Sequence, residues 1–325
     1  MKNNIIQDYG KTVTPELYTN ALQGHQYIPQ ADQCILNVIK TYRENVWGKE
    51  KIEPLHIIDA GCGPGRLTHK IGKMGPEYFT YGLDISESFI AFAKKNNPYG
   101  NQGYFLCEDF SNPPTNSFVP SAEIILMQGV MHHVHGDDRE KFLQRSFELL
   151  KPEGILIIGD EFIKDYESEE ERVLNVAKFY LHIIDEARKG GFDELAEEEA
   201  KNLIDDCLSG TEYAGYATEE TFNIIYECAK ETNDSFYQSG CRSLEPSTHL
   251  VSSDIATILI NQIKESIQSL VESSSEENFN RGDYKVSINI FAEELSLYGF
   301  KLKEKYEIGP VKQLGGMGVL VFTKQ

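Results

Sequence analysis

An acidic residue followed by three alternating glycines is the stretch of this sequence best suited to hold a small ligand. Asp59 stands two residues before Gly61, and Gly63 and Gly65 follow at the same spacing. A turn without side chains lets a ligand approach the backbone closely. The Asp59 carboxylate would repel a pyrophosphate, but it suits a ligand that carries a cationic amino group. The dinucleotide pattern GxGxxG does not fit, because Arg66 stands where its third glycine would be.

Two histidines and two carboxylates supply a second group of reactive side chains. His132 and His133 follow an apolar run at residues 122–127, and Asp160 and Glu161 follow the next apolar run. An imidazole can act as a general base near neutral pH, and a carboxylate can orient a hydroxyl or an amine. His132 is therefore the first candidate for a catalytic base and His133 the second. Asp160 and Glu161 are the candidates for substrate contact.

A metal site is the alternative interpretation of the histidine segment. His135, Asp137 and Asp138 extend the same cluster, and Asp160 could join it from the following strand. Histidines are poor ligands for magnesium, however, and no spacing for a tetrahedral zinc site is present. We therefore predict no metal.

Strands and helices must alternate along the chain to place these residues. Apolar runs predict strands at residues 55–58, 79–83, 103–107, 122–127 and 155–159. Amphipathic stretches predict helices between them at residues 67–73, 87–95 and 139–150. Continuous apolar strands that alternate with helices indicate a parallel sheet with both faces covered. Ligands of such sheets bind at the carboxyl ends of the strands, where the glycine turn and the histidines lie.

Another acidic residue falls at the carboxyl end of the second predicted strand. Asp84 comes nineteen residues after Gly65, where an acidic side chain can accept hydrogen bonds from both ribose hydroxyls of a nucleoside. The alternative is an N-cap for the helix at residues 87–95, although Ser86 would serve equally well as that cap. The spacing favours the ribose role, and the two roles are compatible.

Five features occur in an order that resembles the class I S-adenosylmethionine (SAM)-dependent methyltransferases. They are the glycine turn, Asp84, Asp109 after the third strand, the histidine segment and a turn at residues 151–154, and together they span residues 55–163. A purely structural turn or an NAD site would not predict all five. The resemblance implies SAM as cofactor and S-adenosylhomocysteine (SAH) as product. It implies cofactor contacts at Asp59, Gly61, Cys62, Gly63, Gly65, Asp84, Ile85, Asp109, Phe110 and Gln128.

The resemblance also implies roles for single residues. Similar enzymes place an acidic residue after the third strand to bind the adenine amino group, and Asp109 matches that position. Phe110 would pack on the adenine ring, while a turn role is the alternative for Asp109. Small-molecule O-methyltransferases with an xxHDW loop use its histidine as the base, and His132 falls on that position. This sequence differs from that loop, because His133 and Val134 replace its last two residues.

The predicted fold is an α/β, doubly wound, mostly parallel sheet of seven strands with a helical insertion after strand 5. Residues 1–50 are predicted as a helical segment that closes over the cofactor, so that Tyr18 or another tyrosine there could touch the SAM sulfonium. Residues 51–162 and 284–325 form the SAM-binding Rossmann-like domain, which ends with a helix at 287–297 and strands at 301–307 and 317–323. The insertion is residues 163–283, with helices predicted at 167–188, 193–208, 218–232 and 253–272.

Composition and charge narrow the range of partners. The chain has 325 residues, a formal net charge of −20 and a pI near 4.8. Such an acidic protein is poorly suited to nucleic acid, whose phosphates need clustered Lys and Arg, but it tolerates neutral or cationic substrates. No apolar run approaches the length of a membrane span or a signal peptide. The six cysteines show no CxxC spacing, which favours a reduced, cytoplasmic protein.

These features predict a SAM-dependent methyltransferase that acts on an oxygen or nitrogen atom of a small molecule. The insertion would form a lid over the acceptor, and it is also the predicted surface of a homodimer. A protein methyltransferase is the alternative within the same chemistry. A SAM-binding protein without catalysis, whose insertion mediates assembly, is the alternative from a different class. An NAD-dependent oxidoreductase is disfavoured by Arg66 and Asp59.

Overall fold

The computed structural model describes residues 11–192 except 12, 26, 49–51, 101–102 and 135, then residues 195, 199, 203 and 206, and finally residues 283–325. The predicted helices at 218–232 and 253–272, most of the helix at 193–208, Tyr9 and His135 lie outside the described residues. The chain divides into two compact units. One contains Met1–Phe162 and Val286–Gln325, and the other is Ile163–Lys285.

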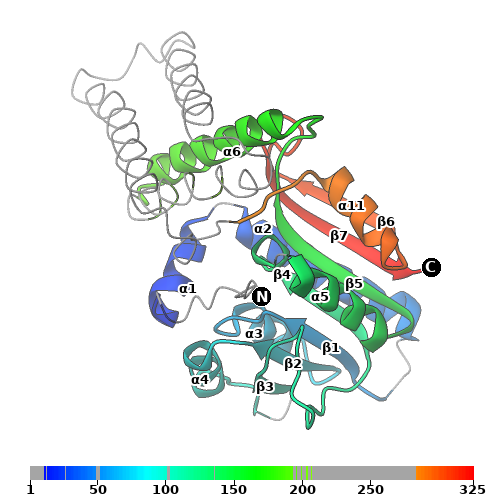
Figure 1. The fold of residues 1–325 in the computed structure, drawn as a ribbon. Helices are drawn as coiled ribbons and strands as arrows, with labels where there is room; N and C mark the ends of the chain where they lie inside the picture. Colours follow the sequence, from blue (N-terminus) through cyan, green and yellow to red (C-terminus); the bar gives the residue numbers. More distant parts are fainter. Residues whose placement is uncertain are drawn as a thin grey trace. The chain divides into compact units, whose positions relative to one another are not determined.

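The first unit is built on a seven-stranded sheet in the order β3-β2-β1-β4-β5-β7-β6 (Figure 1). The five strands β1–β5 run parallel, and β7 lies antiparallel to both β5 and β6. This sheet confirms the predicted fold class. The strands are β1 (Leu55–Ala60), β2 (Tyr78–Asp84), β3 (Gly103–Cys107), β4 (Ala122–Gln128), β5 (Leu150–Phe162), β6 (Phe300–Ile308) and β7 (Gly316–Lys324).

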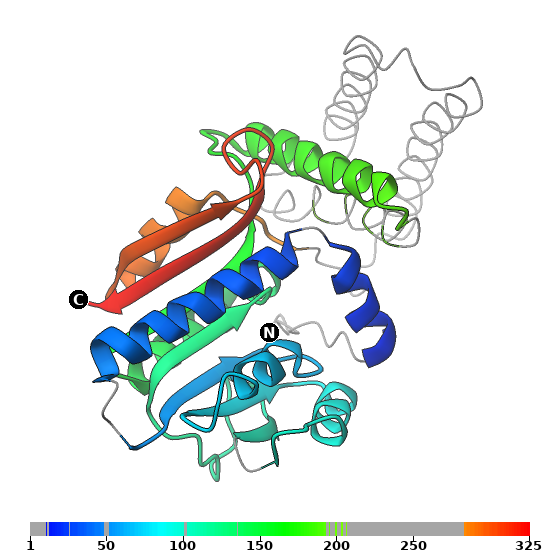
Figure 2. The ribbon, with the colours of Figure 1, turned by 180° about the vertical axis from the view of Figure 1, so that it is seen from behind.

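Helices cover both faces of the sheet, as a doubly wound fold requires. The helices α2 and α3 lie on one face, and α5 and α11 lie on the other (Figures 1 and 2). Buried strands of this kind need apolar residues on both sides, and every residue from Ala122 to Met127 in β4 is buried. The helices are α1 (Pro15–Gly24), α2 (Ile28–Tyr42), α3 (Arg66–Gly72), α4 (Glu87–Lys95), α5 (Gly136–Leu149) and α11 (Ile288–Leu297).

The helix α2 shows how sequence pattern and packing agree. Its apolar residues recur at helical spacing and face the sheet, and one buried acidic residue, Asp32, interrupts the stripe. Asp32 is only 1% exposed and pairs with two cations of α3, Arg66 and Lys70. A buried carboxylate needs such partners. Arg66, which breaks the dinucleotide pattern, therefore fastens α3 to α2.

The second unit contains the helix α6 (Glu169–Lys189), followed by the separate described residues. A buried polar network joins this helix to residues near the end of the unit. The Lys285 ammonium donates to Asp206 Oδ2 at 2.8 Å and to the Tyr180 hydroxyl at 2.7 Å, and Tyr180 donates to Asp206. All three side chains are at most 2% exposed, and burial raises the pKa of Asp206. In the described part of the chain, no helix has both the length and the apolar character needed to cross a membrane.

Candidate active site

The glycine turn leaves β1 and is fixed against the end of β2 by its backbone. The amides of Gly61 and Cys62 both donate to the Leu83 carbonyl, at 2.8 and 2.9 Å, and the Gly63 amide donates to Asp84 Oδ2 at 2.8 Å. Asp84 therefore orders the turn from the neighbouring strand. The N-cap role belongs to Ser86, whose hydroxyl accepts the Phe89 amide at the start of α4.

Close packing explains the glycines at the two ends of the turn. A Cβ on Gly61 would lie 2.5 Å from Cγ2 of Val130, which is too close for any side chain. Gly65 has φ +83° and precedes α3, and a Cβ there would lie 3.0 Å from Cβ of Ala93. At Gly63 the nearest atom is 3.8 Å away, on Tyr18. A side chain at this middle position would therefore project into the space beside the turn.

That space is an open pocket at the carboxyl ends of the parallel strands. Most of the residues predicted to contact the cofactor line its wall, together with one of the two histidines. The predicted residues that line it are Gly61, Gly63, Asp84, Ile85, Asp109, Phe110 and His133, and Tyr18 of α1 joins them.

The third strand contributes an acidic turn and an aromatic ring to the pocket. Oδ1 of Asp109 accepts the Ser111 amide at 2.8 Å and the Ser111 hydroxyl at 2.6 Å, so Asp109 does hold its own turn. An additional contact with adenine stays a prediction. Phe110 packs on Phe142 of α5 with ring centroids 4.6 Å apart, which presents a buried aromatic wall to the pocket.

Four residues that were predicted to contact the cofactor do not line the pocket. Asp59 is 1% exposed and accepts the Thr68 hydroxyl at 2.5 Å, and burial raises its pKa to about 6. Cys62 packs in a buried cluster with Ile90, Ala93 and Phe105. Gly65 caps α3, and Gln128 ends β4 with its side-chain oxygen against Gly159. These residues shape the turn and the strand ends behind the pocket.

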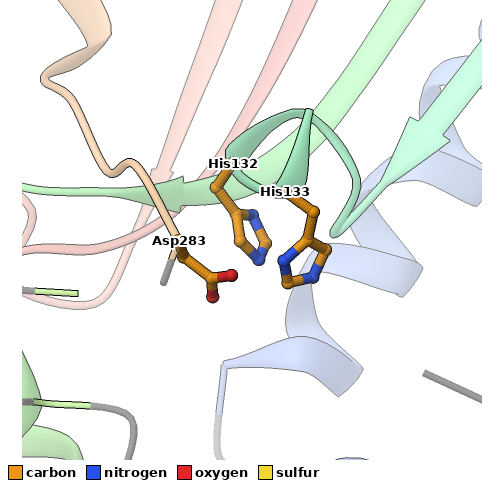
Figure 3. Close-up of side chains that lie close together, drawn as sticks. All are labelled: His132, His133 and Asp283. Carbon is orange, nitrogen blue, oxygen red and sulfur yellow. The ribbon is translucent and has the colours of Figure 1, made fainter. Parts of the chain in front are cut away.

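His132 and His133 project from a single turn of 3₁₀ helix, Met131–His133, that follows β4 (Figure 3). Their rings lie 3.8 Å apart between centroids. His133 lines the pocket, whereas His132 is 9% exposed and faces Asp160 at the end of β5. The two candidates for the base therefore differ in place, one on the pocket wall and one behind it.

Asp160 is the anchor of this turn. Its Oδ2 accepts the backbone amides of Met131 at 2.9 Å and His132 at 3.3 Å, and its Oδ1 faces Nδ1 of His132. When Nδ1 carries the proton that it donates to Asp160, the basic nitrogen of His132 is Nε2. A buried carboxylate that holds one imidazole nitrogen in this way fixes both the tautomer and the direction of the ring.

Glu161, the other predicted substrate contact, lies near a histidine of the N-terminal segment. Its Oε1 is 3.3 Å from Nε2 of His25, and Nδ1 of His25 accepts the Tyr27 amide. Neither Asp160 nor Glu161 lines the pocket. The sequence did not identify several residues that do as site residues, and only those beside strand ends carried a signal of that role. They are Leu83, Phe89, Glu108, Gly129, Val130, Val134 and Phe142.

Comparison with known proteins defines the class. A family model described as a methyltransferase domain matches residues 57–154. A curated relative from Ailuropoda melanoleuca is 31% identical over 173 residues, which cover 49% of this chain and 71% of the relative. The chain belongs to the class I SAM-dependent methyltransferases, and it is an enzyme that uses SAM as its cofactor. The family and the cofactor predicted from the sequence are thereby confirmed.

The particular proteins that it resembles are also methyltransferases. The relative just described is an N-terminal Xaa-Pro-Lys N-methyltransferase 1, and the protein of that name from Rattus norvegicus is 28% identical over 231 residues, 63% of this chain and 96% of the relative. Among solved structures, magnesium protoporphyrin IX methyltransferase from Synechocystis PCC 6803 with bound SAH is 13% identical, with a TM-score of 0.46 over 93% of this chain and 84% of that one.

The residues of the pocket fit a SAM molecule. The open side of Gly63 leaves room beside the backbone, and Asp84 and Phe110 line the pocket at the ends of two neighbouring strands. Bound SAM supplies the methyl group on a sulfonium, which aromatic rings attract. The protein's contribution is to hold the acceptor atom in line with that methyl group.

Proposed function

We propose that this enzyme methylates a nitrogen or oxygen atom of a small molecule, with His132 as general base and Asp160 as the carboxylate that orients it. The observation that carries the proposal is the contact of Asp160 with Nδ1 of His132 and with the backbone of the histidine turn. A base held in this way removes the acceptor's proton as the methyl group is transferred. General base catalysis of this kind contributes about 10²–10⁴-fold to a rate.

The charge of the protein supports a neutral or cationic acceptor. The pocket wall carries Asp84, Glu108 and Asp109, and the whole chain has a net charge of −20. An anionic acceptor would be repelled from this field, whereas an amine or an uncharged hydroxyl would enter it. The same acidic wall is proposed to hold the cofactor through Asp84 and Asp109, with the glycine turn beneath the methionine end and Tyr18 beside the sulfonium.

A second candidate acceptor is the terminal amine of a protein. It is favoured by the likeness to the N-terminal Xaa-Pro-Lys N-methyltransferases, which spans 96% of the rat relative. The chemistry at the site would be the same, because an amine that arrives protonated must lose a proton before it attacks. The two candidates differ in what surrounds the acceptor atom.

The test is methyl transfer from labelled SAM to a defined panel. The panel contains phenols and catechols as oxygen acceptors, primary and secondary amines as nitrogen acceptors, and a peptide that begins Ala-Pro-Lys. We expect turnover of a small molecule that falls at least about 100-fold in His132→Asn, the lower end of base catalysis. Turnover of the peptide alone would replace the first candidate with the second. Full activity of His132→Asn would overturn the role of the base.

The other predicted features support roles that we also propose. Residues 1–50 would close over the cofactor, and residues 163–283 would act as a lid over the acceptor or as the contact of a homodimer. The scattered cysteines favour the cytoplasm as the location. Limited proteolysis with and without SAH tests the first two roles, because a segment that closes on a ligand becomes protected.

A further inference from the structure

The histidine turn is held at both of its ends. At its amide end, Asp160 accepts the backbone N–H groups of Met131 and His132. At its carbonyl end, Nη1 of Arg139 donates to the backbone oxygens of Met131 and Val134, the latter at 3.2 Å. A one-turn helix leaves most of its backbone groups without internal partners. A carboxylate and a guanidinium satisfy these groups here, one at each end and each with the sign that suits the helix dipole.

Arg139 is itself fixed by an acidic residue from far along the chain. Its Nε donates to Glu294 Oε1 at 2.6 Å, and its Nη2 donates to Glu294 Oε2 at 2.8 Å, which makes a two-pronged ion pair between α5 and α11. The guanidinium also lies over the Phe291 ring, 5.3 Å from its centroid. The Arg139 and Glu294 side chains are 13% and 28% exposed. Paired geometry of this kind is rigid, because both planar groups lock together.

We propose that Arg139 and Glu294 are positioning residues for methyl transfer, which hold the histidine turn at the distance and angle that the acceptor requires. The inference rests on the proposed function, since it assigns them to the same base. Arg139 reaches the carbonyls on both sides of the two histidines, so its place sets the place of both rings. Loss of this support would let the turn shift, and a displacement of about 1 Å can cost about 10²-fold in rate.

The competing explanation is that this ion pair merely fastens α11 to α5. If the ion pair only joined these two helices, its loss would lower the stability of the fold and leave the histidine turn in place. The two explanations differ in their effect on the histidine rings, because Arg139 bonds to the turn and Glu294 does not. Glu294 bonds to Arg139 and not to the turn. Replacing Glu294 therefore tests whether its effect passes through Arg139, while every residue of the turn stays the same.

The experiment compares Glu294→Gln with Glu293→Gln, an exposed neighbour on the same helix. The probes are SAH affinity by calorimetry, kcat and KM for the acceptor of the panel that turns over fastest, and NMR spectra of protein labelled at its eight histidines. For Glu294→Gln we expect kcat to fall about tenfold, KM to change less than threefold, SAH affinity to stay within twofold and the His132 and His133 signals to move. Glu293→Gln should match the unchanged enzyme.

A double variant separates this inference from the proposed function. If the ion pair acts through the base, His132→Asn combined with Glu294→Gln should be no slower than His132→Asn alone, since residues that act as a unit are not additive. Multiplied losses, or an unchanged kcat and unmoved histidine signals in Glu294→Gln, would overturn the inference. Full activity of His132→Asn alone would instead overturn the proposed base. Glu294→Asp, which keeps the charge, should recover part of the lost kcat and thus exclude misfolding as the cause.

Discussion

The carboxylate of Asp160 faces Nδ1 of His132 and also accepts the backbone amide of the same residue. One acidic side chain therefore fixes both the position of the histidine turn and the direction of the imidazole. The two residues are 28 positions apart, with Asp160 near the end of β5 and His132 in the turn that follows the neighbouring parallel strand β4. The same carboxylate therefore anchors the backbone of the turn and determines which nitrogen of His132 is basic.

Replacing Asp160 with Asn should slow methyl transfer by about 100-fold, because general base catalysis is worth about 10²–10⁴-fold and needs the correct tautomer. The amide keeps the size of the side chain but loses the charge and half of the acceptors. The measurement is kcat at saturating SAM. Glu161→Gln is the matched control, since it removes the neighbouring carboxylate, which lies near His25 instead. Equal losses in the two variants would contradict a special role for Asp160.

Replacing Asp84 with Ala should weaken binding of both SAM and SAH by at least about tenfold. The variant removes the proposed ribose contact, and it also removes the acceptor of the Gly63 amide. Loss of a charged hydrogen-bond partner costs about 1.5–3 kcal/mol, which corresponds to this change in affinity. Calorimetric titration gives both constants. Glu87→Gln, an exposed residue of α4, should bind normally. Unchanged affinity in Asp84→Ala would place the cofactor elsewhere.

Burial of Asp59 makes the stability of the fold depend on pH. Its pKa in the folded protein is raised to about 6, while in an unfolded chain the value is about 3.9. Between these values the folded state binds more protons, so this group lowers the free energy of unfolding as the pH rises from about 4 to about 6. Asp59→Asn removes this pH-dependent contribution to the free energy of unfolding, which amounts to at most about 3 kcal/mol.

Urea unfolding at pH 4.5 and pH 7.5 tests this prediction. The free energy of unfolding of Asp59→Asn, relative to that of the natural protein, should be higher at pH 7.5 than at pH 4.5. The control variant Glu53→Gln, at an exposed position, should show the same pH dependence of stability as the natural protein. Parallel curves for Asp59→Asn and the natural protein would show that Asp59 does not titrate in this range.

Replacing Lys285 with Met should destabilise the second unit strongly at alkaline pH. It leaves Asp206 buried without its cation, and breaking a buried pair in this way costs about 3–5 kcal/mol. Burial already raises the pKa of Asp206, so the carboxyl is neutral at low pH and the loss should be smaller there. Thermal melts at pH 5 and pH 8.5 give the comparison. The double variant with Asp206→Asn should recover stability at the higher pH, and equal losses at both values would refute the argument.

Apolar runs located the strands β1–β5, whereas β6, which is mostly exposed, and β7 were located through the family resemblance. The β5 strand differs most, since it begins at Leu150 and not at residue 155. The pairing of Ala122 with Leu150 comes before a register shift, and Glu153 with φ +63° lies between the two parts. The predicted turn at residues 151–154 is therefore part of the strand. The helix α1 was not predicted as a separate element within residues 1–50.

The site was predicted less completely than the sheet. Spacing placed Asp84 and Asp109 at strand ends, and both line the pocket. It brought Asp160 near the histidines only as a possible metal ligand and did not show that the carboxylate faces Nδ1 of His132, because side-chain direction depends on the fold. Arg139 and Glu294 are 155 residues apart in the sequence, and the residues of the second unit lie between them along the chain. No local pattern in the sequence can reveal such a pair.

The alternation of side chains along β5 has a consequence for how this protein can change. Asp160 and Glu161 are consecutive, so they point to opposite faces of the sheet, one towards His132 and the other towards His25. Deleting or inserting one residue upstream in this strand would exchange the two faces. A deletion would bring Phe162 to the place of Glu161, and an insertion would bring Gly159 to the place of Asp160, so in either case one imidazole would lose its carboxylate. The end of β5 can therefore accept substitutions one residue at a time, but it cannot accept a change of length.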